Sequence, residues 1–368
     1  LGARLLIELR REHPELIVEG IGGPLMEAQG LSSLFPMDRL SVIGLVEPFK
    51  RLPELLRIRS AMYEHFRRSP PDLFLGIDSP DFTLHLEQKL RRLGIPTAHL
   101  VSPTIWAWRG GRIKKIKRAV DLMLCLFPFE LPVYARHEVP AEFVGHPLAD
   151  EIGPVQDRDA ARAALDLPLD STVLAMLPGS RSGEVARLLP RFLATVQALR
   201  VRHPQLQVLV PAASRQRRVQ IEDILGSRPG NEVRVFDGQA RLAMTAADAV
   251  LLASGTATLE AALLQRPMVV AYRMSALSFA IMKALATTRY VSLPNILLDK
   301  AVVPEFFQRD VNAQTLAPIV SALLEGDVAA RQQQDEFAGL HASLSLNFAE
   351  RAAAALLALI CRKTADDA

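Results

Sequence analysis

Short apolar runs of strand length alternate with longer segments of helical periodicity along most of the chain. In the first half, the apolar runs predict strands at residues 16–19, 73–77, 97–101, 122–126 and 142–144. In the second half, they predict strands at residues 172–177, 207–210, 233–236, 249–252 and 268–272. Regular alternation of strands with helices is typical of parallel sheets that are covered by helices on both faces. The pattern therefore predicts an α/β protein built from doubly wound parallel sheets.

The two series of strands predict two domains, which is also the expectation for a chain of 368 residues. We place the join near residues 150–154, so that the predicted domains are residues 1–150 and 151–310. Residues 311–368 follow as an Ala-rich helical tail. We expect this tail to pack across the domains or onto a partner subunit, which leaves a homodimer open.

The composition is that of an ordinary globular protein, with 49% hydrophobic residues and a net charge of only +3. A general nucleic-acid binder usually has a stronger excess of positive charge, so we expect no nucleic-acid partner. The two cysteines, Cys125 and Cys361, are too few for a disulfide framework or a zinc site. We recognise no signal peptide and no apolar run long enough to span a bilayer, and we therefore expect a cytoplasmic protein.

Two turns of the second half suit a diphosphate, because each places small residues at the start of a helix that follows a strand. These turns are "LPGSR" at residues 177–181 and "ASGTATLE" at residues 253–260. Free backbone N–H groups at a helix N-terminus favour an anion, and Arg181 adds a bidentate cation. Glu260, one turn into the second helix, is placed to accept hydrogen bonds from ribose hydroxyls. The candidate binding residues in these turns are Gly179, Ser180, Ser254, Gly255 and Thr256. The alternative is that the hydroxyl residues only cap helices.

The stretch "GIDSPDF" at residues 76–82 ends a predicted strand on Asp78. In parallel sheets, ligands bind at the carboxyl ends of strands, so Asp78 is a candidate general base. The alternative is that Asp78 or Ser79 caps the next helix, with Pro80 in its first position.

Two segments combine apolar or aromatic residues with cations, at residues 40–57 and 105–118. An apolar patch with a cationic rim suits an anionic bilayer surface or an acyl chain. The candidate lipid-facing residues are Val42, Ile43, Leu45, Val46, Phe49, Trp106, Trp108, Arg109, Arg112, Lys114 and Lys115. Two alternatives stay open, an amphipathic core helix with a solvated basic face and a site for single-stranded nucleic acid.

Together these motifs resemble the lipid-A-disaccharide synthase family, glycosyltransferases of lipopolysaccharide assembly in Gram-negative bacteria. The resemblance rests on "GIDSPDF", "LVSPTIWAWRGGRIKKI", "FPFE", "FVGHPLAD", "LPGSRSGEV", "LLASGTATLEAAL", "PMVVAYRM" and "YVSLPN". It implies a GT-B architecture, in which two Rossmann-like domains face a cleft. It also implies that UDP-2,3-diacylglucosamine donates its sugar, with inversion, to 2,3-diacylglucosamine 1-phosphate (lipid X). The implied products are a disaccharide 1-phosphate and UDP.

The resemblance also implies roles for individual residues. Asp78 matches the family's essential aspartate, and Arg181 and Asn295 match residues on the donor side. Tyr272 and Arg273 match positions that line the donor site. No metal or other cofactor is expected, and the cytoplasmic leaflet of the inner membrane is the expected location.

Family members carry an opening strand and a "GEASGD" turn just before the point at which this sequence starts, at Leu1. We therefore expect the first sheet to lack a central strand. Two other interpretations stay open. One is another GT-B-like UDP-sugar enzyme, such as a UDP-N-acetylglucosamine 2-epimerase, and the other is an inactive nucleotide-binding fragment.

Overall fold

A computed structural model of the chain describes residues 1–40, 47–103, 110–226, 233–275, 279 and 289–366. The chain forms two compact units, of which one is Leu1–Asp150 with Ser345–Ala368 and the other is Glu151–Leu344. The tail expected as one segment at residues 311–368 is therefore divided, because residues 311–344 belong to the second unit and residues 345–368 to the first.

The second unit contains a six-stranded parallel sheet in the order β12-β11-β10-β7-β8-β9. Its strands are β7 (Val173–Leu177), β8 (Gln207–Ala212), β9 (Val233–Asp237), β10 (Ala249–Ala253), β11 (Met268–Tyr272) and β12 (Glu305–Phe307). Every residue of the central strands β7 and β10 is buried, because helices cover both faces of the sheet.

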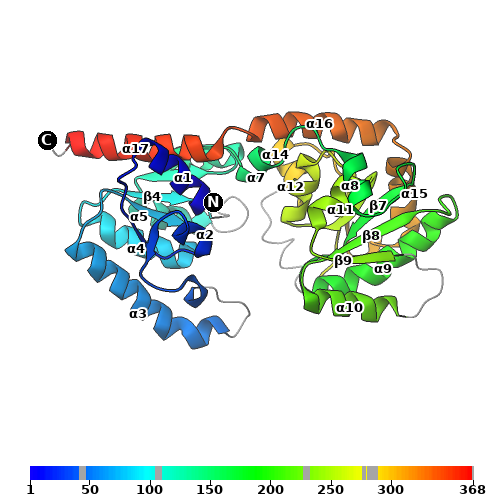
Figure 1. Cartoon of the computed structure of the whole chain (residues 1–368), viewed down its shortest axis with the longest axis horizontal. Coiled ribbons are helices and arrows are strands. Elements are labelled where there is room, and N and C mark those ends of the chain that lie inside the picture. The colour runs from blue at the N-terminus through cyan, green and yellow to red at the C-terminus, as the bar shows by residue number, and fades with distance from the viewer. Residues whose placement is uncertain (41–46, 104–109, 227–232, 276–278, 280–288, 367–368) are drawn as a thin grey trace. The chain divides into compact units, whose positions relative to one another are not determined.

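Helices α9 (Ser182–Arg200), α10 (Arg215–Leu225) and α15 (Ala313–Leu324) share one hydrophobic core with the sheet (Figure 1). Phe192 of α9, Leu251 of β10 and Val320 of α15 belong to this core. The remaining helices include α11, which packs on β7 and β8, and α12, which packs on β10 and α16. Their bounds are α8 (Arg158–Ala164), α11 (Ala240–Ala246), α12 (Thr256–Leu263), α14 (Leu293–Leu298) and α16 (Val328–Leu344), with the 3-10 helix η4 (Gln308–Asp310).

The first unit contains two parallel sheets, β1-β2 and β3-β4-β5-β6. The strands are β1 (Val18–Gly20), β2 (Leu31–Ser33), β3 (Phe74–Ile77), β4 (Thr97–Leu100), β5 (Leu122–Cys125) and β6 (Ala141–Phe143). Within the described part of the chain, no strand joins the smaller sheet to the larger one.

The helices of the first unit are α1 (Gly2–Glu12), α2 (Pro24–Glu27), α3 (Glu47–Arg68), α4 (Pro80–Arg91), α5 (Ile113–Ala119), α6 (Leu131–Ala135), α7 (Pro147–Glu151) and α17 (Phe348–Asp366). Three 3-10 helices accompany them, η1 (Met37–Arg39), η2 (Gly110–Arg112) and η3 (Pro128–Glu130). The predicted α/β architecture with parallel sheets is confirmed in both units.

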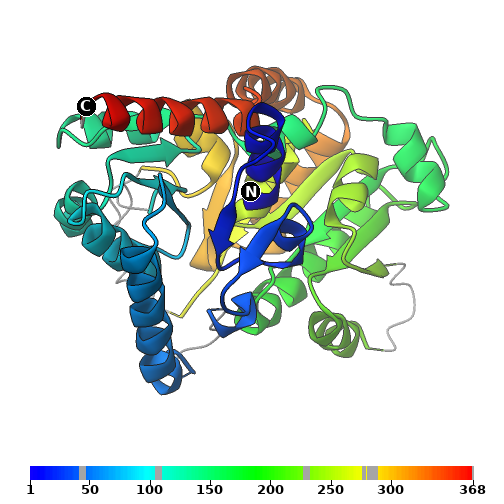
Figure 2. The ribbon, with the colours of Figure 1, turned by 60° about the vertical axis from the view of Figure 1, so that its left-hand side comes forward.

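The C-terminal helix α17 packs against the N-terminal helix α1, as both views show (Figure 1 and Figure 2). Phe348 and Leu356 of α17 share a core with Leu5 of α1 and with Leu124 of β5. The Asp150 carboxylate anchors the start of α17, because it accepts hydrogen bonds from the Phe348 N–H at 2.6 Å and the Asn347 N–H at 3.1 Å. These contacts explain why the last helix belongs to the first unit.

One stretch of the described chain, residues 328–363, is long and apolar enough to cross a membrane by length and composition. The expectation that no such stretch exists is therefore wrong. The stretch consists of α16 and α17, which are separate helices, and each buries apolar residues such as Phe337 and Leu356. The apolar character of both helices is explained by this burial within their own units.

Candidate active site

Three adjacent strands of the second unit bring the expected donor-site residues to one edge of its sheet. Strand β10 pairs in parallel with β7 on one side and with β11 on the other. The carboxyl ends of parallel strands meet at the same edge, which is where α/β proteins bind ligands. The residues that follow β7 and β10 or end β11 at this edge are Gly179, Ser180, Arg181, Ser254, Gly255, Thr256, Tyr272 and Arg273.

The turn between β10 and α12 is open. Helix α12 begins after Gly255 and has no side-chain cap, so the capping alternative is not what the structure shows. Within the described chain, no hydrogen bond uses the backbone N–H groups of Thr256 or Ala257. Gly255 and Thr256 are exposed, and a Cβ built on Gly255 would meet no atom within 4 Å. These N–H groups are therefore available to an anion.

The turn between β7 and α9 is filled by the side chain of Glu184. The Glu184 Oε2 atom accepts from the N–H groups of Ser180 and Arg181, both at 3.2 Å. Gly179 has a φ of +113°, and a Cβ at this position would lie 2.6 Å from the Glu184 Cβ. The space beside Gly179 therefore holds a side chain of the protein, and the expected part of Gly179 in donor binding stays a prediction.

Glu260, which we expect to contact a ribose, is oriented by a residue that sequence reasoning missed. The Arg241 Nε atom of α11 lies 3.1 Å from Glu260 Oε1, and its Nη1 atom lies 2.7 Å from Glu151 Oε1. The second oxygen of Glu260 makes no hydrogen bond within the described chain. Arg241 thus fixes one carboxylate oxygen and leaves the other for a ligand.

Arg273, which follows β11, interacts electrostatically with Arg187 and Arg191 of α9. Burial lowers the pKa of Arg273, and the positive charges of Arg191 and Arg187 lower it further. Burial and the Glu184 carboxylate raise the pKa of the Tyr272 phenol. Mutually repelling guanidinium groups favour the binding of an anion between them.

The side chain of Asn295, which the resemblance assigns to the donor side, is buried inside the second unit, and its role towards the donor stays a prediction. Asn295 is only 1% exposed. Its Nδ2 atom donates to Val303 O at 2.8 Å and to Glu305 Oε1 at 2.9 Å. Its Oδ1 atom accepts from the N–H groups of Val302 and Val303. All hydrogen-bonding positions of this side chain are therefore used inside the protein.

Glu305 of the edge strand β12 organises the segment that contains Asn295, and sequence reasoning missed it. Its carboxylate accepts from the backbone N–H groups of Val291 and Ser292 and from the Ser292 hydroxyl at 2.6 Å. The carbonyl of Val291 in turn accepts from Ser254 Oγ at 3.4 Å. Asn295 and Glu305 thus hold the segment that adjoins the open turn.

Asp78 of the first unit lies in a strained turn at the carboxyl end of β3. Asp78 and Ser79 have φ values of +53° and +47°, which is the left-handed region that non-glycine residues rarely adopt. The Asp78 N–H donates to Leu100 O, and the Thr83 hydroxyl donates to Asp78 O. The Asp78 side chain is exposed and makes no hydrogen bond within the described chain, and α4 has no side-chain cap. Backbone strain of this kind is concentrated at functional sites.

Most of the expected lipid-facing residues lie outside the part of the chain that the structure describes. These are Val42, Ile43, Leu45, Val46, Trp106, Trp108 and Arg109, together with the side chain of Phe49. Arg112 is described and pairs with Asp81 at 2.7 Å, at the start of α4. Lys114 is exposed on α5, and Lys115 is half-buried.

A basic groove of about 590 Å³ lies beside α4 and α5. We call it the α4–α5 groove, and it is lined by Gln88, Arg91, Arg92, Lys114, Lys117 and Arg118. Arg91 pairs with Asp121 and Lys117 with Glu138, whereas the other three cations make no ion pair within the described residues. The pKa of the nearby His85 is lowered by its burial and by surrounding cations that include Arg92. The potential at this surface is therefore positive.

His146, near the end of the first unit, has a structural role. It stacks on Phe127 with ring centroids 5.2 Å apart, and its Nδ1 atom accepts from the Leu148 N–H. Burial lowers the pKa of His146 to about 4. A histidine with this pKa is uncharged at neutral pH.

We expect His146 to make the stability of the first unit depend on pH. Unfolded His146 binds a proton below its ordinary pKa of 6.5, whereas the folded form does so only near pH 4. Its contribution is therefore complete above pH 6.5 and is lost as the pH falls towards 4, with a slope of up to about 1.4 kcal/mol per pH unit. Urea unfolding of His146→Asn should show a flatter pH dependence over this range, and an unchanged slope would contradict the assignment.

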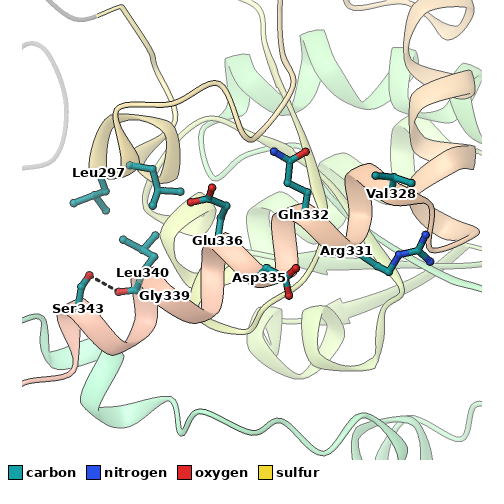
Figure 3. Close-up of a pocket in the computed structure, with 10 residues that line it drawn as sticks. Leu297, Val328, Arg331, Gln332, Asp335, Glu336, Gly339, Leu340 and Ser343 are labelled. Carbon is teal, nitrogen blue, oxygen red and sulfur yellow. Dashed lines mark hydrogen bonds between the residues drawn. The ribbon is translucent and has the colours of Figure 1, made fainter.

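A second groove, of about 720 Å³, lies between α14 and α16 (Figure 3). Leu297, Val328 and Leu340 contribute apolar surface, and Asp335 and Glu336 contribute charge. None of the expected site residues lines this groove. We assign it no part in the chemistry.

The described residues contain no group of three or more His, Cys, Asp or Glu side chains that could hold a metal ion. The expectation that the reaction uses no metal is a statement about chemistry, and it stays a prediction.

A family model and several relatives of known name match nearly the whole chain. A family model described as lipid-A-disaccharide synthetase matches residues 1–360. Lipid-A-disaccharide synthase from Pseudomonas aeruginosa (strain PAO1) is 50% identical over 363 residues, which cover 99% of this chain and 95% of that protein. The synthase from Hahella chejuensis is 51% identical over 98% of this chain and 91% of its own length.

Solved structures share the fold at low sequence identity. Acinetobacter baumannii MurG matches with a TM-score of 0.58 and 15% identity, over 96% of this chain and 95% of its own. UDP-GlcNAc 2-epimerase from Neisseria meningitidis, bound to UDP-GlcNAc, matches with a TM-score of 0.60 and 12% identity, over 98% and 95%. These similarities show the GT-B fold alone.

Proposed function

The chain belongs to the lipid-A-disaccharide synthase family and is a glycosyltransferase, and from this premise we propose a reaction with named substrates and residue roles. The proposed donor is UDP-2,3-diacylglucosamine, and the proposed acceptor is 2,3-diacylglucosamine 1-phosphate. The products are a β-1′,6-linked disaccharide 1-phosphate and UDP. The observation that carries this proposal is that the family's motifs fall at the carboxyl ends of strands in both units.

In the first unit, Asp78 is the proposed general base. Its carboxylate takes the proton from the 6-hydroxyl of the acceptor while that oxygen attacks C1 of the donor sugar. The bond between C1 and the diphosphate oxygen breaks, its electron pair leaves with UDP, and the configuration at C1 inverts. The exposed Asp78 side chain, without a hydrogen-bond partner in the described chain, supports this role.

In the second unit, the proposed diphosphate ligands are the N–H groups at the open turn before α12. Arg181 stabilises the charge that develops on the leaving UDP, and Tyr272 and Arg273 line the same edge of the sheet. Glu260, oriented by Arg241, accepts hydrogen bonds from the ribose. Asn295 acts as a positioning residue through the segment that it holds.

No metal is needed in this proposal, because guanidinium groups and helix N-termini offset the charge of the diphosphate. To test the proposal, the protein is incubated with UDP-2,3-diacylglucosamine and lipid X in the presence of EDTA, which removes free metal ions. The product then reports on both the substrates and the stereochemistry. We expect a disaccharide whose proton NMR coupling shows a β-linkage. An α-linked product, or none, would contradict the proposal.

We further propose that the protein works at the cytoplasmic leaflet of the inner membrane, where both lipid substrates are held. The positive α4–α5 groove supports contact with anionic headgroups.

Removing two cations from this groove should weaken membrane binding. Each Lys or Arg at an anionic surface contributes about 1 kcal/mol, so Lys114→Gln with Arg118→Gln should lower the vesicle partition coefficient by roughly 30-fold. Flotation with phosphatidylglycerol vesicles measures this coefficient. The matched control is Arg215→Gln with Arg217→Gln, which removes the same charge from α10 of the second unit. An equal loss in both variants would show that net charge, and not this groove, binds the vesicle.

A further inference from the structure

The carboxylate of Glu184 holds Arg181 by two independent sets of contacts. One oxygen, Oε1, lies 3.0 Å from Arg181 Nη1, and the other accepts the backbone N–H groups of Ser180 and Arg181. The Glu184 side chain is only 13% exposed, whereas that of Arg181 is 80% exposed. Glu184 is therefore the fixed member of the ion pair, whereas the Arg181 side chain is mostly exposed to solvent.

The absence of a side chain at Gly179 leaves the space that the Glu184 side chain occupies. A Cβ on Gly179 would lie 2.5 Å from the Glu184 Oε2 atom and 2.6 Å from its Cβ, so any larger residue would displace the side chain. The Glu184 carboxylate contacts Ser180 and Arg181 directly, and it also raises the pKa of Tyr272 at the end of β11. The carboxylate therefore stands among the residues proposed to bind the donor.

Arg181 is thus already paired with an anion of its own chain when no donor is bound. A diphosphate that approaches Arg181 meets a carboxylate of the same sign and competes with it for the guanidinium. The pair is exposed on the Arg181 side, and exposed ion pairs are weak enough for a phosphate to replace. The Glu184 carboxylate can pair with Arg181 again when UDP leaves.

We propose that Glu184 competes with the donor's diphosphate for Arg181, so that it weakens UDP binding and speeds product release. This inference rests on the proposed function, in which Arg181 binds the diphosphate. Glu184 acts through Arg181 and is a positioning residue.

The substitution Glu184→Gln separates the charge from the hydrogen bonds. The Gln carbonyl oxygen accepts from the N–H groups of Ser180 and Arg181, but it carries no charge to attract the guanidinium. We expect the calorimetric Kd for UDP to fall about two- to fivefold, and UDP to inhibit the reaction more tightly by the same factor. The control Glu222→Gln breaks the exposed pair with Arg218 on α10 and should leave the Kd unchanged.

A double-mutant cycle with Arg181→Ala completes the test. In the Arg181→Ala background, Glu184→Gln should change the Kd for UDP much less than it does in the unmodified protein. The small effect that remains reflects only the loss of charge repulsion between the Glu184 carboxylate and the diphosphate. If Arg181→Ala leaves the Kd for UDP unchanged, the proposed role of Arg181 fails, and this inference fails with it. If Arg181→Ala weakens binding while Glu184→Gln weakens it too or has no effect, only the competition is overturned. Thermal unfolding of each variant shows whether a loss of binding reflects a loss of folding.

Discussion

Replacing Asp78 by Asn should lower kcat for disaccharide formation by about 10²- to 10⁴-fold and leave the Kd for UDP nearly unchanged. The carboxylate supplies the base for proton removal, and general base catalysis contributes a factor of this size. UDP contacts the second unit in our proposal, whereas Asp78 belongs to the first. Single-turnover kinetics and calorimetry with UDP measure the two quantities.

Asp81→Asn is the matched control, because Asp81 lies three residues after Asp78, in the first turn of α4, and pairs with Arg112. We expect its kcat to stay within about threefold of the unmodified protein, as for other exposed ion pairs. Parallel loss of UDP binding and catalysis in Asp78→Asn would contradict the role of Asp78 as a base.

Replacing Asn295 by Ala should destabilise the second unit by about 2–4 kcal/mol, because it leaves one buried and one half-buried backbone N–H group without partners. The affected groups are the N–H groups of Val302 and Val303, and the Glu305 carboxylate loses one donor. We expect Tm to fall by roughly 5–15 °C, measured by calorimetry. A variant with unchanged Tm and no activity would show that Asn295 contacts the substrate directly, against the buried geometry.

The apolar runs predicted ten strands, and each of them is present with small shifts at its ends. Two strands were missed, β2 (Leu31–Ser33) and β12 (Glu305–Phe307). Both have three residues and lie at the edge of a sheet, where only one neighbour and partial burial leave a weak pattern.

The division of the tail could not be predicted from periodicity. An amphipathic pattern shows that a helix has an apolar face, but it does not show which core the face covers. The contacts that assign α17 to the first unit come from distant parts of the chain, among them Leu5 of α1, Leu124 of β5 and Asp150.

The candidate site was located from local motifs, and the contacts that the sequence did not predict are ones that these motifs do not contain. The glycine and hydroxyl pattern located both turns, yet only the structure shows that Glu184 fills one of them. Arg241 and Glu305 were missed because each meets its partner through the fold, from a different helix or strand. An asparagine in a motif gives no sign of whether it faces a ligand or the core.

The most direct test of the central claim is to measure UDP and disaccharide together as UDP-diacylglucosamine and lipid X are consumed in mixed micelles. The account predicts that the two products appear in equal amounts, only when both substrates are present, and that Asp78→Asn abolishes both. UDP released without disaccharide would show hydrolysis, and conversion of the donor to an epimer without lipid X would show an epimerase. Either result would contradict the assignment of glycosyl transfer to this chain.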